Sequence, residues 1–547
     1  MAPLRFRTGV ALASILLAGA APPSPAPISA ARIKEHVRIL ASDAFLGRGP
    51  TQPGEAKTID YLARQFEAAG LRPAGPNGSW FQDVPLIRYD RGPVRIGASV
   101  GGRPLPLRIG QDVTAASRIV GRTSIVDAPI VFGGYGVTAP ELGFNGYEGV
   151  DLKGKVVLVL AGDPDFEAGR DLGFGGRALA FAGRTGEKIA AAQARGAIAV
   201  LTIHETAAAS YPWQQVQGGD PVPGYALDPG GPVRSGFGLR GWMRREVAVE
   251  LLRRAGLDYG RLKRQAQSPA FRAVAVGDAT LSADFTTSAS KVVSRNVVGL
   301  VPGRGQASET ILYGAHWDAY GVNSFDPPQD RIRNGAVDNA TGTATLIEVA
   351  RAFAQAPSPQ RSILFAAWTA EEKGLLGASW YAEHPLRPLE TTAAVFNLDP
   401  HVALGAARNL ELIGVGRTPL EQDLARVART RGLRVDPEDN SEAGWYYRSD
   451  HFALAQKGVP TVYFRAGRDL VRGGKRAGSA AVERYNARCY HQTCDEFDER
   501  WDMAGPAQEG SVAFDLGLEL ANSRRWPGWN AGSDYARLRE ASTRQRK

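Results

Sequence analysis

The stretch Ile311–Pro400 decides the fold, because it combines buried-strand patterns with acidic and histidine side chains. It contains Ile311-Leu-Tyr-Gly-Ala-His316-Trp-Asp318, then Gly335-Ala-Val-Asp338-Asn339, then Ala366-Ala-Trp-Thr-Ala-Glu371-Glu372, and finally Asn397-Leu-Asp399-Pro400. The short apolar runs at 310–315, 362–368 and 394–398 are typical of strands buried on both faces of a mostly parallel sheet. Ligands bind beyond the carboxyl ends of such strands. We therefore expect these polar side chains to meet in one site there.

The residue types in this stretch point to a metal centre. Imidazole and carboxylate ligands suit zinc and its neighbours. Two ions about 3.5–4 Å apart require a bridging carboxylate, and Asp338 is the natural bridge because it lies in an Asp-Asn turn before an expected helix. Neighbours on a strand point to opposite faces, so Glu371 and Glu372 can face one site only where the chain turns. Gly374 and Gly377 permit that turn, and one glutamate can then bind metal while the other acts as a base.

Further motifs extend the pattern into a family resemblance. The downstream motifs are Ser449-Asp450-His451-Phe452 and Tyr490-His491-Gln-Thr-Cys-Asp495, and the upstream one is Leu40-Ala-Ser-Asp43-Ala-Phe-Leu-Gly47-Arg48-Gly49. Together these motifs resemble the two-zinc exopeptidases of the M28 family over roughly residues 30–520, including a protease-associated insert. The resemblance implies an α/β three-layer sandwich with a central mixed β-sheet, plus a β-rich insert domain. It also implies a hydrolase that uses a metal-bound hydroxide to cleave the N-terminal peptide bond of peptides.

The same resemblance assigns roles to individual residues. It implies two zinc ions per chain, held by His316 and Asp399 on one ion, Glu372 and His491 on the other, and Asp338 on both. Three more residues would take part without binding metal: Glu371 as general base, Asp318 orienting His316, and Tyr490 as hydrogen-bond donor to the developing oxyanion. A cis peptide bond between Asp338 and Asn339 is also implied. Pro400 departs from the family pattern, which has an apolar residue with a backbone N–H at that position.

Several functional alternatives stay open at this level. Aminopeptidase action is favoured by the resemblance and by the many acidic residues, which attract a positive α-amino group rather than a carboxylate. A carboxypeptidase or dipeptidase on the same fold is the second possibility. A single-zinc cyclase or acyltransferase is the third. A binding protein with a dead site would require lost ligands, and none of the expected ligands is missing.

Composition and the N-terminus indicate where the protein acts. The chain has 547 residues and a net charge of +9, but its basic residues are interleaved with acids, which argues against nucleic-acid binding. Arg5, Arg7 and the apolar stretch 9–19 form an export signal, with cleavage expected after Ala20. No later stretch is long and apolar enough for stable membrane insertion. We expect a periplasmic or secreted protein that acts on peptides, and the sequence does not indicate its oligomeric state.

Composition shifts along the chain predict its domain organisation. After the signal segment 1–20, residues 21–93 form the first part of the catalytic domain, and 94–289 form the protease-associated insert. The catalytic domain resumes over 290–525, and 526–547 form a basic C-terminal tail. The insert is either a lid or wall for the substrate, or a spacer without catalytic residues. Residues 207–236 and 465–488 are rich in glycine and are expected to be loops.

The only two cysteines, Cys489 and Cys494, flank His491. Exported proteins meet an oxidising compartment, and an even cysteine count favours pairing. We therefore expect a disulfide that constrains the loop around His491.

Overall fold

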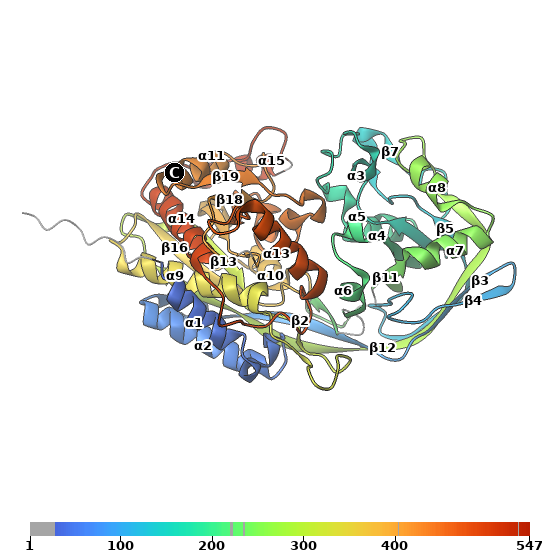
Figure 1. Cartoon of the computed structure of the whole chain (residues 1–547), viewed down its shortest axis with the longest axis horizontal. Helices are drawn as coiled ribbons and strands as arrows, with labels where there is room; N and C mark the ends of the chain where they lie inside the picture. The colour runs from blue at the N-terminus through green and yellow to red at the C-terminus, as the bar shows by residue number, and fades with distance from the viewer. Residues whose placement is uncertain (1–27, 219–222, 234–235, 403, 534, 547) are drawn as a thin grey trace, which may run out of the picture.

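The computed structural model of the chain describes residues 28–218, 223–233, 236–402, 404–533 and 535–546. The expected signal segment 1–20 lies outside the described residues. Two modules share one long strand, β12 (Val274–Val301), whose residues 287–297 pair with β2 (Phe81–Arg91). Figure 1 shows this pair of strands running beneath both modules.

The catalytic module is built on a mixed sheet with the strand order β12-β16-β13-β17-β20-β18-β19. The three expected apolar runs form its centre: β16 (Arg361–Trp368) and β17 (Thr392–Asn397) both pair in parallel with β13 (Gln306–His316). β20 (Thr461–Ala466) is parallel to β17, whereas β18 (Asn409–Leu412) is antiparallel to β20 and parallel to β19 (Arg434–Pro437).

Helices cover both faces of this sheet. Alternate residues of β13 pack on opposite sides: Tyr313 belongs to one buried cluster and Leu312 to another. The Tyr313 side is covered by α1 (Ala30–Leu40), α2 (Gly54–Ala69), α9 (Gly342–Gln355), α11 (Leu420–Thr430) and α14 (Ala504–Ala521). The Leu312 side is covered by α10 (Leu376–Glu383) and α12 (His451–Ala455). The predicted three-layer α/β sandwich with a mixed sheet is therefore confirmed.

The second module has a hydrophobic core of its own, drawn from residues between Ala98 and Phe285. Its strands β5 (Gly121–Phe132), β8 (Val156–Leu160), β9 (Ala199–His204) and β11 (Leu239–Arg244) extend the sheet beyond β12. Hairpin strands β3 (Arg95–Val100) and β4 (Arg103–Pro106) and helices α4 (Thr185–Gln193), α7 (Arg245–Arg254) and α8 (Tyr259–Gln265) complete it. This arrangement agrees with the expected β-rich insert, which lies beside the catalytic module (Figure 1).

Two segments expected to be loops contain regular structure. Residues 207–236 include part of α5 (Thr206–Ala209), together with α6 (Trp213–Gly218) and β10 (Gly224–Leu227). Residues 465–488 end in α13 (Gly474–Arg488), a helix of 15 residues. The glycines of this segment suggested a loop, but packing of Gly478 and Val482 against the catalytic module stabilises the helix instead.

The C-terminal segment is packed rather than extended. It contains α15 (Ala536–Ala541), whose Arg539 is 4% exposed and donates hydrogen bonds to the backbone oxygens of Thr392 and Ala393 at 3.0 and 3.3 Å. The basic tail therefore covers the start of β17. Among the described residues, none of the helices has the length and apolar character needed to cross a bilayer.

Candidate metal centre

The predicted ligands lie where the central strands end. His316 is the last residue of β13, and Asp399 follows β17 by two residues. Glu371 and Glu372 lie in the turn after β16, where Ala370 and Leu375 adopt positive φ angles of 53° and 60°. This turn satisfies the requirement that the two neighbouring glutamates face the same site.

Asp338 stands between the two histidines. It lies in a short π-helical turn (Ala336–Thr341) before α9, and its peptide bond to Asn339 is cis, as expected. Its Oδ1 is 3.2 Å from Nε2 of His316, and its Oδ2 is 3.2 Å from Nε2 of His491. Each carboxylate oxygen therefore faces one imidazole, which is the geometry that a bridging ligand requires.

The side chains form two groups that could each hold an ion. One comprises His316, Glu371 and Asp399, and the other Asp338, Glu372 and His491, with ligand atoms within 4.8 Å of one another in each group. The first group contains Glu371, to which the family resemblance assigns the role of base. Its Oε2 lies 3.9 Å from Nε2 of His316, farther than the 3.2 Å from Asp338. The shorter distance is consistent with Asp338 as the ligand shared by both ions.

The electrostatics of these residues fit bound cations. Burial raises the pKa of both Glu371 and Glu372 well above the ordinary value, and neighbouring carboxylates, including Asp338 beside Glu372, add to the effect. Burial also raises the pKa of Asp338, but contacts with His316 and His491 outweigh it and lower the pKa overall. The Oε1 atom of Glu372 is buried and has no hydrogen-bond partner among the described residues. Buried, closely spaced carboxylates of this kind are unfavourable as anions unless cations compensate them, so the donor set fits zinc.

The contacts of Asp318 match only part of the role expected for it. Nδ1 of His316 lies 3.0 Å from the backbone oxygen of Asp318 but 3.8 Å from its carboxylate. The carboxylate instead accepts the backbone N–H groups of Glu371 and Glu372 at 3.0 and 3.3 Å. Asp318 is completely buried, and burial raises its pKa. Its carbonyl thus orients the histidine, whereas its carboxylate fixes the turn that bears both glutamates.

The structure reveals supporting residues that the sequence did not single out. The hydroxyl of Tyr320 lies 2.9 Å from Nδ1 of His491, on the side opposite Asp338. Ser449 donates a 2.7 Å hydrogen bond to Oδ2 of Asp399. Ser449 belongs to a motif that was noted, but Tyr320 had no local signal because only the folded chain brings it to His491.

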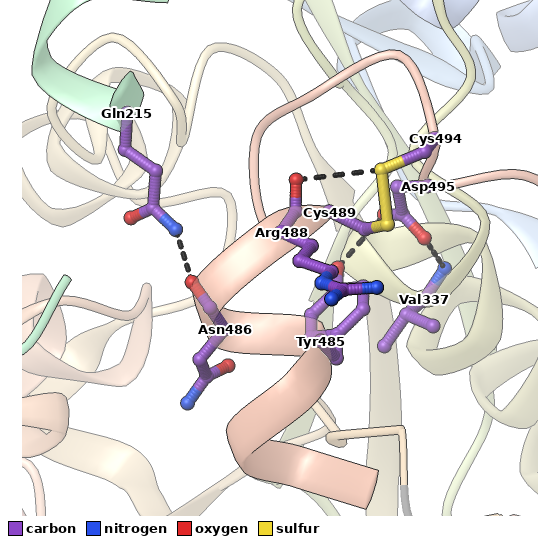
Figure 2. The surroundings of a disulfide bond; sticks show 8 residues. All are labelled: Gln215, Val337, Tyr485, Asn486, Arg488, Cys489, Cys494 and Asp495. Atoms are coloured by element: carbon purple, nitrogen blue, oxygen red, sulfur yellow. Dashed lines mark hydrogen bonds between the residues drawn. A yellow bond between two sulfur atoms is a disulfide. The ribbon is translucent and has the colours of Figure 1, made fainter. Parts of the chain in front are cut away.

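The loop that bears His491 is closed by the predicted disulfide between Cys489 and Cys494, which is confirmed. Asp495 follows directly, and its carboxylate accepts the backbone N–H groups of Val337 and Asp338 at 2.9 and 3.2 Å. Figure 2 shows the disulfide between the end of α13 and Asp495. The same loop therefore positions one histidine and the expected bridging aspartate.

A pocket beside these ligands has both acidic and basic walls. Glu371, Asp399, Pro400 and His401 line one part, and Trp445, Arg448, Arg465 and Tyr490 line another. Tyr490 stacks on His491 with ring centroids 3.7 Å apart, and its hydroxyl accepts a 3.0 Å hydrogen bond from Arg448. By contrast, His451 is buried and packs against Tyr446 and Tyr463 rather than lining this pocket.

Comparisons with known proteins agree with this architecture. Residues 296–514 match the profile of peptidase family M28, and residues 126–233 match the PA domain. The chain is 33% identical to Aminopeptidase NAALADL1 of Mus musculus over 134 residues, which is 23% of this chain and 16% of that protein. It is 37% identical to the Glutamate carboxypeptidase 2 homolog of Caenorhabditis elegans over 111 residues, which is 19% of this chain and 13% of that protein.

A solved structure extends the comparison to most of the chain. The aminopeptidase from Aneurinibacillus sp. strain AM-1 superposes with a TM-score of 0.53 and 17% identity, covering 90% of this chain and 94% of that one. At this identity the likeness shows a shared fold. The matched curated relatives are covered over only a small part of their own length. Together, these findings show a region of peptidase family M28 at residues 296–514, which contains the whole ligand cluster, and a PA domain at residues 126–233.

Proposed function

We propose that the chain is a two-zinc aminopeptidase that removes residues from the free amino ends of peptides. The observation that supports this most directly is the position of Asp338, whose two oxygens each face a different histidine. Two complete ligand groups around one shared carboxylate favour two ions over the single zinc of a cyclase or acyltransferase.

The remaining residues have distinct tasks in this proposal. Bound zinc would polarise the scissile carbonyl and lower the pKa of water. Glu371 lies in the pocket and accepts the proton of that water, then donates it to the leaving amine. Glu372, whose Oε2 is 3.3 Å from Nε2 of His491, binds metal. Tyr490 donates a hydrogen bond to the developing oxyanion, while Arg448 holds its hydroxyl in place.

The charge of the pocket supports attack at the amino end. Glu371 and Asp399 line the part of the pocket beside His316; Glu371 is buried and Asp399 is partly buried. A positive α-amino group is attracted to such a surface, whereas a free carboxylate is repelled. The substrate's first residue would therefore occupy this pocket, with the scissile peptide bond beside the residues that would hold zinc.

A carboxypeptidase or dipeptidase is the second candidate, because Arg448 and Arg465 line the same pocket. A guanidinium beside the ligands could bind the terminal carboxylate of a substrate. Export is supported by the disulfide, since disulfides persist mainly in oxidising compartments. The amino-terminal segment 1–20 would supply the signal.

One experiment separates these candidates. Initial rates are compared for a tripeptide with free ends, its amino-acetylated form and its carboxyl-amidated form, and zinc is measured in the same sample by mass spectrometry. We expect cleavage of the free and amidated peptides, no cleavage of the acetylated one, and two zinc ions per chain. Cleavage of the acetylated but not the amidated peptide would establish the second candidate instead.

A further inference from the structure

A second cavity extends from the metal centre into the space between the two modules. It has a volume of about 520 Å³, within the range of ligand pockets. Tyr320, His491 and Arg448 line its catalytic side, and Tyr211, Arg240 and Trp242 line the side formed by the PA module. Figure 1 shows β11, which bears Arg240 and Trp242, on the side of the PA module that faces the catalytic module.

The two modules are joined at this cavity by direct contacts. Gln215 of α6 donates a hydrogen bond to the backbone oxygen of Asn486 in α13, as Figure 2 shows. The guanidinium of Arg448 lies 5.6 Å from the ring centroid of Tyr211. These contacts hold the wall of the PA module beside the ligand His491, so the cavity belongs to the fold.

The charges of this cavity differ from those of the first pocket, which has both acidic and basic walls. Among the described residues, no aspartate or glutamate lines the cavity, whereas Arg240 and Arg448 both do. Arg448 lines both spaces and stands at their junction. The metal centre therefore lies between a pocket that contains carboxylates and a cavity whose described lining has arginines but no carboxylate.

Arg240 lines the cavity, and its guanidinium has no polar partner among the described residues. Its side chain makes no hydrogen bond, ion pair or ring contact with a described residue, although its backbone is fixed by hydrogen bonds to Ala116 at 2.8 and 2.9 Å. Other arginines of the module do have partners: Arg122 pairs with Asp284, and Arg245 pairs with Glu205. Burial and the nearby Arg118 lower the pKa of Arg240 to about 10, so it stays charged at neutral pH. A half-buried, fixed and unpaired guanidinium is well suited to bind an anion.

We propose that this cavity is a subsite for the leaving part of the peptide, in which Arg240 of the PA module binds a carboxylate. This inference rests on the proposed aminopeptidase function. A short peptide has a positive amino end, which the carboxylates beside His316 would attract, and a negative carboxyl end, which the arginines of the cavity would attract. The carboxylate is either the free carboxyl end of a short peptide or an acidic side chain beyond the cleaved bond. The PA module thus takes part in substrate selection.

The test uses matched peptides with free amino ends. A series from dipeptide to hexapeptide, with leucine first and glycine after it, is prepared with free and with amidated carboxyl ends. A second, amidated pair differs only by aspartate or asparagine in the leaving part. The values of kcat/KM are measured for the wild type, Arg240→Gln and Arg240→Lys, with Arg122→Gln as control, since Arg122 lies outside the cavity and Asp284 keeps Arg95 as a partner.

We expect the wild type to cleave the free-carboxyl peptide about tenfold better than the amidated one at one or more lengths, the size expected for a charge-assisted hydrogen bond. The difference should lie in KM. Arg240→Gln should remove this preference and leave cleavage of the amidated glycine peptides unchanged, while Arg240→Lys should retain part of the preference and Arg122→Gln all of it. A preference in the aspartate pair alone would identify the acidic side chain as the ligand.

Equal kcat/KM for both members of every pair in the wild type would overturn the proposal, as would an unchanged preference in Arg240→Gln. If the amidated peptides are not cleaved at any length while the free peptides are, the carboxylate is required for catalysis itself and the second candidate function replaces the subsite. If no peptide is cleaved by the zinc-loaded wild type, the proposed function itself fails.

Discussion

The carboxylate of Asp318 accepts the backbone N–H of Glu371 in a 3.0 Å hydrogen bond, although the two residues are 53 positions apart. Through this contact, the segment after β13 sets the position of the turn after β16. This contact holds the main chain of Glu371, the expected base, so the carboxylate of Glu371 remains free to accept a proton. Because the second oxygen of Asp318 accepts the N–H of Glu372, one buried side chain fixes both glutamates.

We predict that Asp318→Asn lowers kcat by about 10- to 100-fold, the range found when a partner of a metal site is lost. An amide can accept only one of the two N–H groups through its oxygen, and its NH₂ group would face the other. Zinc content should stay close to normal, because His316 hydrogen-bonds to the backbone oxygen of Asp318 rather than its side chain. Rates and zinc content are measured on the same preparation.

Asp165→Asn is the matched control for that change. Asp165 is also buried and accepts backbone N–H groups from Leu172, Phe174 and Gly176, but it lies in the PA module. Its replacement should lower the melting temperature without a comparable loss of kcat. An Asp318→Asn enzyme with unaltered kcat would show that the turn does not need the carboxylate.

Substitutions of the two neighbouring glutamates should have different effects. Glu371→Gln keeps the size of the side chain but removes the base, so kcat should fall by at least about 10²-fold while zinc content is retained. Glu372→Gln should instead lower zinc affinity, and added zinc should restore part of the rate. Near-normal kcat in Glu371→Gln with both ions bound would exclude the assigned role. Kinetics and zinc titrations of the two variants provide the comparison.

The sequence was informative where chemistry and local pattern coincide. His316, Asp338 and Asp399 stand in motifs that flank buried strands or begin a helix, so both the sheet and the cluster at its edge could be predicted. The disulfide between Cys489 and Cys494 followed from the even cysteine count and the expected export. These features depend on short stretches of chain and on composition.

Contacts between distant segments could not be predicted in the same way. Tyr320 and His491 are 171 positions apart, and nothing near Tyr320 distinguishes it from a core tyrosine. The sequence of α13 predicts a loop, because its glycines have low helix propensity and its stabilising contacts come from the tertiary fold. Likewise, the lack of a side-chain partner for Arg240 among the described residues becomes evident only when its surroundings are known.

We predict that Tyr320→Phe weakens zinc binding at the ion held by His491 by about tenfold, the lower end for loss of such a partner. Nδ1 of His491 would lose its 2.9 Å hydrogen bond, and the ring would be less well oriented toward Glu372 and Asp338. Competition with a chelator, followed by metal analysis, measures the change. Tyr381→Phe is the control, since its buried hydroxyl has no partner among the described residues. Equal zinc retention in both variants would contradict the prediction.

The PA module contains a buried lysine whose effect on stability should depend on pH. Lys188 donates hydrogen bonds to the backbone oxygens of Leu160 and Gly162, and burial lowers its pKa from 10.5 to about 7. Between about pH 7 and 10 the unfolded chain binds this proton more tightly than the folded chain, so raising the pH increases stability. Below pH 7 Lys188 is protonated in both the folded and the unfolded state, so the full free-energy cost of burying its charge lowers the stability of the folded state.

Replacing this lysine by methionine should therefore remove a pH-dependent contribution. We expect the melting temperature of the wild type, relative to Lys188→Met, to rise from pH 7 to pH 9. One proton contributes at most about 1.4 kcal/mol per pH unit. The nearby Asp163 has a pKa raised to about 6 by burial, so it stays ionised over this interval and adds no slope. Parallel melting curves for both proteins at the two pH values would contradict the assignment.

The disulfide between Cys489 and Cys494 should affect metal binding more than global stability. It joins residues only five positions apart, and a ring of that size contributes roughly 2 kcal/mol in the chain-entropy description. His491 lies inside the ring, and Asp495 directly after it holds the N–H of Asp338. In the double variant Cys489→Ser, Cys494→Ser, we therefore expect a small fall in melting temperature but a clear loss of zinc at neutral pH.

Treating the wild type with a phosphine reductant should reproduce this loss of zinc, whereas the same reagent should leave the zinc content of the double variant unchanged. Full zinc content in the double variant would show that packing of α13 alone holds His491 and Asp338 in place.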